Sequence, residues 1–306
     1  MTLQQLRQVL TIAESNSMNE AAKKLFVSQP NLSATVREVE EELGITVFMR
    51  NNRGITVTAE GEEFLGYAKQ VVEQYHLLEN RYLNVESKKK FSVSMQHYSF
   101  AVKAFVQLAK EVGMDEYEFA VHETKTKEVI DNVKNLKSEI GVLYLSDFNE
   151  KVLRKLFKEC DIEFKELFTC NTYVYLWKKH PLAGQKEITL DDLQEYPCLT
   201  FEQGVNNSFY YAEEMMSTYE YKRVIKADDR ATMLNLMVGL NGFTLCSGII
   251  SEDLNGDDYA AIPLKESEIM HIGYIKHKGT KLSKLGEIYI CLLYTSPSPR
   301  DRSLSR

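Results

Sequence analysis

The chain has 306 residues, 44% hydrophobic and 26% charged, so it can bury two or three compact cores and is expected to be globular. Its net charge of -7 argues against nonspecific coating of nucleic acid, but leaves open a DNA reader whose few basic groups are placed locally. The N-terminal segment lacks the features of a secretory signal and no nearby apolar run is long enough to cross a membrane, so we expect a cytoplasmic location.

Two short helices are expected first. Apolar side chains recur at helical spacing through residues 3–13, and the polar stretch Ser15–Ser17 then interrupts them. Ser17 and Glu20 have the spacing of a capping box, in which the hydroxyl bonds to a free amide and the glutamate reaches back. The second helix is therefore expected to begin at Met18.

A third helix is expected to run to about Leu43. Ser28 is placed as its N-cap, and Pro30 lies in the first turn, where its missing N–H costs nothing. The apolar stripe of this helix consists of Leu32, Val36, Val39 and Leu43. The opposite face is centred on Pro30, Ala34, Arg37 and Glu41 and is flanked by Gln29 and Ser33.

Small and hydrogen-bonding side chains occupy the N-terminal end of this outward face. A helix that enters the major groove by its N-terminal end needs them, with Gln29 suited to an adenine edge and Ser33 to a base or a phosphate. Considered alone, the helix is equally well explained as an ordinary amphipathic helix with a solvated face.

A polar turn follows between two apolar pairs. Val47-Phe48 and Ile55–Val57 bracket Arg50–Gly54, which predicts a two-stranded wing. Arg50 and Arg53 at its tip are long cations that can reach phosphate or the minor groove, unless they are simply solvated.

Many short motifs in the right order now make the resemblance specific. The stretches Ala21-Ala22, Leu25–Pro30, Leu32-Ser33, Glu38–Glu40, Leu43-Gly44, Val47-Phe48, Arg50, Arg53-Gly54 and Val57–Gly61 resemble the winged helix-turn-helix of LysR-type transcriptional regulators. One departure is Ala34, where members of the family often carry a basic residue, so a base contact there would be apolar. The resemblance implies a DNA interface made of Ser28, Gln29, Pro30, Ser33, Ala34, Arg37, Arg50 and Arg53.

A long helix is expected to connect this domain, residues 1–58, to the rest of the chain. Thr58 is a plausible N-cap, and no proline interrupts the linker, residues 59–88. A stripe at coiled-coil spacing consists of Phe64, Ala68, Val71, Tyr75, Leu78, Tyr82 and Val85. The family resemblance implies that this stripe forms a homodimer, with a tetramer left open; the alternative is packing against the chain's own domain.

Residues 89–290 are expected to form an α/β sensor of two lobes. Strands and helices alternate from Phe91 to Leu145, and a second set, including a helix over Asn207–Tyr219, follows. Further stretches resemble LysR-type effector domains, which resemble periplasmic binding proteins; they are His180–Gly184, Leu190–Leu193 and Gly239–Phe243. On that likeness, lobe I comprises about 91–163 and 265–290 and lobe II about 164–264, with the first crossing near Ile162–Lys165.

Loops that follow strands in the two lobes are the candidates for binding a small-molecule effector of unknown identity. They contribute Gln96, His97, Tyr98, Ser99, Glu123, Thr124, Ser146, Thr200, Phe201, Glu202, Gln203, Asp229 and Arg230. The alternatives are capping or solvated acids for Glu123, Glu202 and Asp229, and a satisfied, partly buried ring for His97.

The sequence holds no motif of an enzyme, and no cofactor or metal is expected. The five cysteines form no C-x-x-C pair, and His271 and His277 are poorly spaced as metal ligands. Residues 291–306 change abruptly in character and resemble translated sequencing-adaptor runs, so we expect a non-native disordered tail that truncates a helix starting near Leu282.

The resemblance therefore implies a transcription regulator whose binding to double-stranded DNA is modulated by the effector, with RNA polymerase as a further partner and no membrane. The alternative is a cytoplasmic small-molecule-binding protein without DNA-binding activity.

Overall fold

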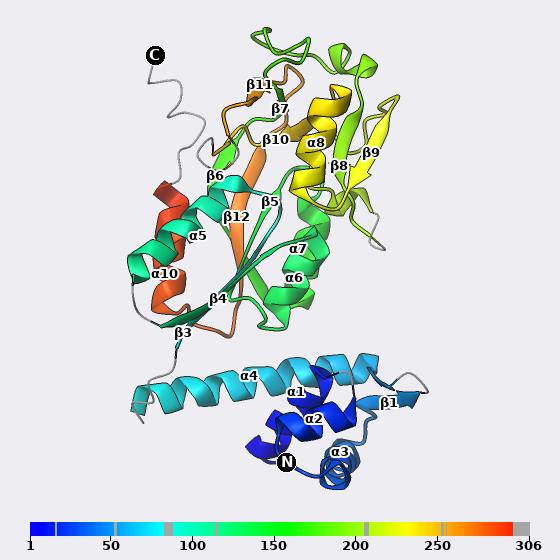
Figure 1. Cartoon of the computed structure of the whole chain (residues 1–306), viewed down its shortest axis with the longest axis vertical. Helices are drawn as coiled ribbons and strands as arrows, with labels where there is room; N and C mark the ends of the chain where they lie inside the picture. Colours follow the sequence, from blue (N-terminus) through cyan, green and yellow to red (C-terminus); the bar gives the residue numbers. More distant parts are fainter. Residues whose placement is uncertain are drawn as a thin grey trace. The chain divides into compact units, whose positions relative to one another are not determined.

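The computed structural model divides into two compact units, unit 1 (Met1–Ser87) and unit 2 (Lys88–Arg306), shown in Figure 1. The residues that it describes are 1–15, 17–51, 54–82, 88–113, 116–204, 208–251, 254 and 256–295.

Unit 1 begins with three helices: α1 (Leu3–Ala13), α2 (Met18–Lys24) and α3 (Gln29–Leu43). The hydroxyl of the residue before each helix, Thr2, Ser17 or Ser28, accepts a hydrogen bond from a backbone N–H in the first turn. The predicted starts of the second and third helices are therefore confirmed. Leu43 was expected in the apolar stripe of α3 but is 37% exposed, because the helix ends there and Gly44 turns the chain with a φ of 70°.

The wing and a long helix complete unit 1. Strands β1 (Phe48–Asn51) and β2 (Gly54–Val57) pair antiparallel, which confirms the predicted hairpin, and α4 (Ala59–Tyr82) follows. Thr58 caps α4 as expected, because its hydroxyl accepts a hydrogen bond from Gly61 N at 2.9 Å.

The stripe on α4 divides into two parts. Ala68 is buried and Phe64 packs against the core of α1–α3, so the first part serves unit 1 itself, as the alternative interpretation expected. Val71, Tyr75 and Leu78 are exposed, although the Arg7 guanidinium lies over the Tyr75 ring at 5.3 Å. The Tyr82 side chain and Val85 lie outside the described residues.

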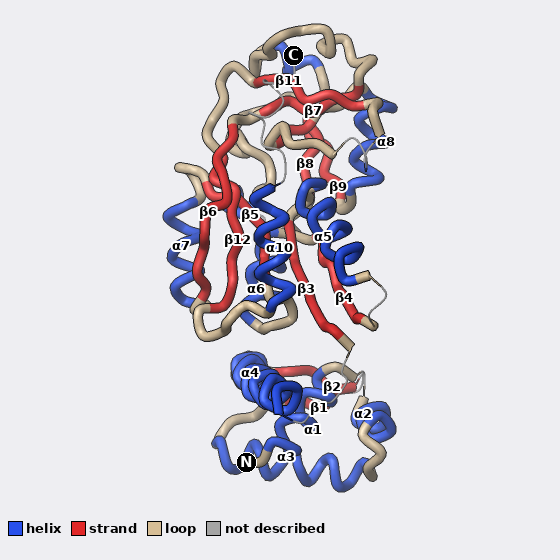
Figure 2. Tube along the Cα trace, turned by 90° about the vertical axis from the view of Figure 1, so that its left-hand side faces the viewer, coloured by secondary structure: helices blue, strands red, loops and turns tan. Residues whose placement is uncertain are grey.

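Lobe I of unit 2 is a five-stranded sheet in the order β4-β3-β5-β12-β6. Helices α5 and α10 cover one face and α6 and α7 the other (Figures 1 and 2). Its elements are β3 (Lys89–Met95), α5 (Ser99–Val112), β4 (Tyr117–Glu123), α6 (Thr126–Lys134), β5 (Ile140–Leu145), α7 (Glu150–Glu159), β6 (Ile162–Cys170), β12 (Met270–His277) and α10 (Lys284–Thr295). Strands β3, β4 and β5 are parallel, as the alternation of strands and helices predicted.

Two expected boundaries are wrong. Strand β6 pairs with β12 along its whole length, so the first crossing between lobes follows Cys170 rather than lying at Ile162–Lys165. The expected tail also begins too early at Cys291, because α10 continues to Thr295 and buries Leu293. Residues 296–306 lie outside the described residues.

Lobe II holds an antiparallel sheet in the order β10-β7-β11 and a parallel pair, β8 and β9. Helix α8 packs on β7 and β8 through Met233 and Met237. Its elements are β7 (Tyr173–Trp177), the 3₁₀ turns η1 (Asp192–Glu195) and η2 (Phe209–Tyr211), β8 (Cys198–Phe201), β9 (Val224–Ala227), α8 (Arg230–Leu240), β10 (Thr244–Cys246) and β11 (Tyr259–Pro263).

The helix expected over Asn207–Tyr219 does not form in the described part of that segment. Only the 3₁₀ turn η2 is present, and the backbone carbonyls of Ala212 and Glu214 accept hydrogen bonds from the Tyr144 hydroxyl. The segment therefore bonds to lobe I instead of to itself. It runs as an irregular strap between the two lobes.

Candidate functional site

The N-terminal end of α3 presents polar groups to solvent. Ser28, Pro30, Ala34 and Arg37 are exposed, and Gln29 and Ser33 are half-buried. The amide of Gln29 donates a hydrogen bond to the Ser33 hydroxyl at 3.0 Å, so the two side chains lie together on one face. This surface has the small and hydrogen-bonding groups that a major-groove reader requires.

Glu40 ties the wing to this helix. Its Oε1 accepts hydrogen bonds from the backbone amides of Val47 at 2.7 Å and Phe48 at 3.0 Å. Sequence reasoning gave Glu40 no role beyond a family motif, because its partners are backbone atoms. Of the two wing arginines, Arg50 lies in β1 with a side chain that is not described, and Arg53 lies outside the described residues.

A cavity of about 80 Å³ lies between the two lobes of unit 2. This exceeds the ~10–15 Å³ that one water needs, so the cavity has room for a small molecule. Its lining consists of His97, Tyr98, Ser99, Tyr175, Phe201, Glu213, Glu214, Arg230, Met233, Leu234, Thr244, Leu245, Cys246, Ser247, Ile249, Ile250 and Met270. Of the residues expected to bind effector, five line it: His97, Tyr98, Ser99, Phe201 and Arg230.

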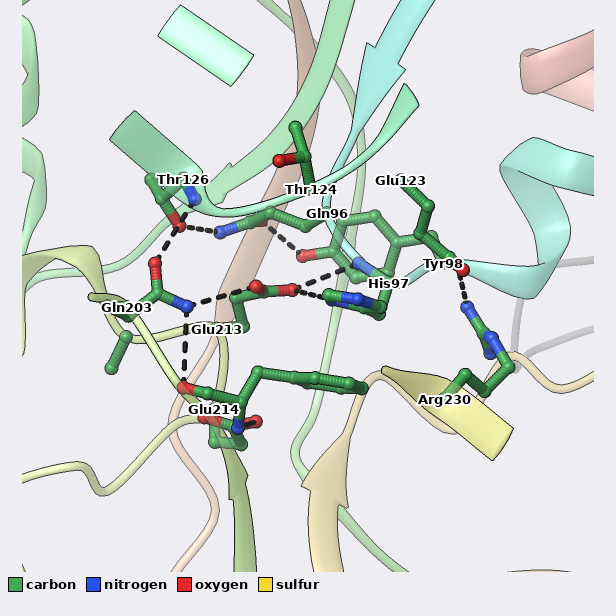
Figure 3. A network of polar contacts seen from close by, with 12 residues as sticks. Gln96, His97, Tyr98, Glu123, Thr124, Thr126, Gln203, Glu213, Glu214 and Arg230 are labelled. Atoms are coloured by element: carbon green, nitrogen blue, oxygen red, sulfur yellow. Dashed lines mark hydrogen bonds and ion pairs between the residues drawn. The ribbon is translucent and has the colours of Figure 1, made fainter. Parts of the chain in front are cut away.

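The polar centre of the cavity is Glu213, which His97 and Gln203 approach from opposite sides (Figure 3). His97 bonds to Glu213 Oε2 through Nδ1 at 2.8 Å and donates from its backbone N–H at 3.0 Å. The Gln203 amide donates to Glu213 Oε1 at 3.0 Å. The His97 ring also stacks on Phe201, with ring centres 3.6 Å apart.

Gln96 and Gln203 lie behind the cavity wall rather than in it. The Gln96 amide donates to the Thr126 hydroxyl at 2.6 Å, and its carbonyl oxygen accepts from the Tyr98 hydroxyl at 3.0 Å. The Thr126 backbone N–H donates to Gln203 Oε1 at 3.2 Å. These amides therefore join lobe I to lobe II, and neither of them lines the cavity.

Six further expected residues also lie outside the cavity lining. Asp229 is the N-cap of α8, which its alternative interpretation expected, and Ser146 is buried with its N–H bonded to Asn149. Glu202 accepts from Gly204 N at 2.9 Å and pairs with Lys226. Of the other three, Glu123 pairs with Arg230 across the lobes, Thr124 bonds to Glu128, and Thr200 lies in β8.

Sequence reasoning missed Glu213 and Glu214, which come from the strap between the lobes. Both were hidden in a segment that was expected to be helical. The only indication in the sequence was a pair of acidic residues next to Met215 in an otherwise uncharged stretch. Such a pair does not reveal whether its side chains are buried.

Glu214 is buried and accepts a hydrogen bond from Phe201 N at 2.9 Å. Burial, and after it the neighbouring Glu213 carboxylate, raises the pKa of Glu214 to about 8, although hydrogen bonds from the backbone lower it in part. The Glu214 carboxyl is therefore mostly protonated at neutral pH.

Glu214 should make the stability of unit 2 fall as pH rises. The unfolded chain releases the Glu214 proton near pH 4.5 and the folded chain releases it near pH 8, so the folded state binds more protons between these two values. The free energy of unfolding therefore decreases as the pH rises from 4.5 to 8. We expect the urea midpoint, read from the fluorescence of the single tryptophan, Trp177, to fall between pH 5 and 8. Glu214→Gln should flatten this decline, and an equal slope in both proteins would contradict the assignment.

No cluster of three or more His, Cys, Asp or Glu side chains able to hold a metal ion occurs among the described residues. None of the helices described is long and apolar enough to span a membrane.

Comparisons with known proteins match both units of the chain. Residues 3–62 match the family model described as bacterial regulatory helix-turn-helix protein, lysR family, and residues 96–287 match the LysR substrate binding domain. The transcriptional regulator CysL of Bacillus subtilis is 24% identical over 300 residues, covering 94% of this chain and 95% of CysL.

Two solved structures share the fold. A full-length OxyR variant from Pseudomonas aeruginosa is 18% identical, with a TM-score of 0.72 over 98% of this chain and 97% of that one. Full-length CbnR complexed with its target DNA is 17% identical, with a TM-score of 0.59 over 97% of this chain and 100% of that one. The chain belongs to the LysR family of bacterial transcription regulators, with an N-terminal helix-turn-helix that binds DNA and a C-terminal effector-binding domain.

Proposed function

We propose that the N-terminal end of α3 reads base edges in the major groove and that the wing arginines Arg50 and Arg53 contact the DNA backbone or the minor groove. The observation that carries this proposal is the face of α3 on which the half-buried, hydrogen-bonded Gln29 and Ser33 lie beside the exposed Pro30, Ala34 and Arg37. The cap at Ser28 supports it, because free amides at a helix start favour a phosphate.

The regulator acts as a homodimer in the cytoplasm and contacts RNA polymerase. Exposed apolar side chains on α4, which are Tyr67, Val71, Tyr75 and Leu78, support pairing with a second copy. A two-fold dimer brings two winged units to two half-sites, which also doubles the few basic contacts.

The effector binds in the cavity between the lobes and changes their relative placement. Contacts that cross from lobe to lobe surround the cavity, among them His97 with Glu213 and Arg230 with Glu123. A ligand that binds one arrangement of the lobes more tightly shifts the population toward it. The altered arrangement then changes how two winged units engage DNA, without any enzymatic step.

Selection from a pool of random duplexes tests the DNA interface. We expect the full chain to enrich an inverted repeat, and Gln29→Ala to weaken binding about tenfold, or ~1.4 kcal/mol, and to relax one position in each half-site. Gln185→Ala, an exposed glutamine in lobe II, is the matched control and should bind as the wild type does. Failure to enrich any sequence across a salt series would overturn the proposal.

A further inference from the structure

The cavity between the lobes is lined by two buried carboxyl groups, Glu213 and Glu214, and only Glu213 has an ion-pair partner among the described residues. Glu213 is paired with His97, and the two side chains are 4% and 6% exposed. Within the part of the chain that the structure describes, no Lys, Arg or His forms an ion pair with Glu214. Arg230 also lines the cavity, but its guanidinium is already paired with Glu123 (Figure 3).

A second observation points to a ligand in the same cavity. Thr244 lines it and is buried, yet its hydroxyl oxygen has no hydrogen-bond partner among the described residues. Buried polar atoms are seldom left unpaired, because each lost hydrogen bond costs free energy. A polar group of a bound molecule would satisfy this hydroxyl.

The remaining walls are largely apolar. Met233, Leu234, Ile249, Ile250 and Met270 surround the polar groups. A ligand that fills the cavity therefore needs an apolar body and a single polar head.

We propose that the effector is a small primary amine, bound as its ammonium ion with N–H groups donated to Glu214 and Thr244 and its apolar body against Met233 and Ile249. The proposal rests on the proposed function, in that this cavity is the effector site. An ammonium ion supplies a cation opposite the ionised form of Glu214, whereas a carboxylate ligand would place a further negative charge beside Glu213 and would disfavour ionisation of Glu214.

Binding of the ammonium ion is coupled to release of the Glu214 proton. The titratable groups that interact with Glu214 are Glu213, which is itself bonded to His97, with Tyr98 and Tyr144 from lobe I and Cys198 and Tyr221 from lobe II. Burial raises the pKa values of the three tyrosines and of Cys198, so these four groups stay neutral between pH 6 and 8. Because Glu214 titrates near pH 8, affinity for the amine should rise about tenfold per pH unit below 8 and then level off.

Calorimetric titration of the full chain with isopentylamine, isopentanol and isovalerate tests the proposal. We expect the amine to bind at least about tenfold tighter than the alcohol or the acid at pH 8. Glu214→Gln should remove this preference, and Glu166→Gln, a carboxyl on β6 paired with His271, should keep it.

The assignment is overturned if isopentanol or isovalerate binds as tightly as the amine or more tightly, or if no probe binds. It is also overturned if the affinity of the wild-type protein for the amine decreases as the pH is raised from 6 to 8. The pH profile needs no variant, so it decides the question even if Glu214→Gln fails to fold. Selection of an inverted repeat by the same preparation reports the proposed function separately, because it requires no ligand.

Discussion

Replacing Glu213 with alanine is expected to lower the free energy of unfolding of unit 2 by about 3–5 kcal/mol. The carboxylate accepts hydrogen bonds from the His97 ring, the His97 backbone N–H and the Gln203 amide, and the His97–Glu213 ion pair is at most 6% exposed. Alanine leaves these donors buried without an acceptor and removes one of the links between the two lobes. The loss should appear as a lower urea midpoint in Trp177 fluorescence, with DNA binding by unit 1 retained.

A second glutamate–histidine pair in the same unit provides the control. Glu166 and His271 approach to 2.7 Å, close to the 2.8 Å of Glu213 and His97, but their side chains are 49% and 36% exposed. Because solvent screens exposed pairs, Glu166→Ala should cost at most about 1 kcal/mol. Equal midpoints for Glu213→Ala and Glu166→Ala would mean that the strap does not depend on this carboxylate.

Most of unit 1 could be predicted because its signals are local. The caps at Ser17 and Ser28 bond within their own first turns, and the wing closes a short loop, so neighbouring residues determine each feature. The same applies to β3, β4 and β5, whose connecting helices are adjacent in the chain. The division of the α4 stripe was harder, because the pattern that buries Ala68 also leaves Leu78 exposed.

The cavity was found only in part, because its polar centre depends on distant contacts. His97 and Ser99 follow a strand and belong to a class of loop that often binds ligands, so the sequence indicated them. Glu213 is 116 residues from His97, in an irregular strap whose path depends on hydrogen bonds to lobe I. Hydrophobic periodicity carries no information about such a segment, and it favoured a helix there instead. The late crossing after Cys170 was missed for the same reason, since the β6–β12 pairing joins segments far apart in the chain.

Replacing Gly61 with alanine is expected to cost about 3 kcal/mol and to abolish specific DNA binding. A Cβ at this first-turn position of α4 would lie 2.4 Å from the backbone oxygen of Val47, which accepts the Thr58 N–H at 3.0 Å. Because that oxygen belongs to the backbone at the start of the wing, relief requires β1 to move relative to α3. The wing arginines would then lose their register with the recognition helix.

Gly239→Ala in α8 separates this clash from the general effect of a methyl group in a helix. No atom lies within 4 Å of a Cβ at Gly239, so alanine should stabilise the chain by about 0.5–1 kcal/mol and leave DNA affinity unchanged. Thermal unfolding by circular dichroism and a mobility shift on the selected repeat measure the two effects. If the Gly61→Ala variant binds DNA with the affinity of the wild type, DNA recognition tolerates movement at Val47. Specificity would then be assigned to α3 alone, because the wing would contribute only nonspecific phosphate contacts.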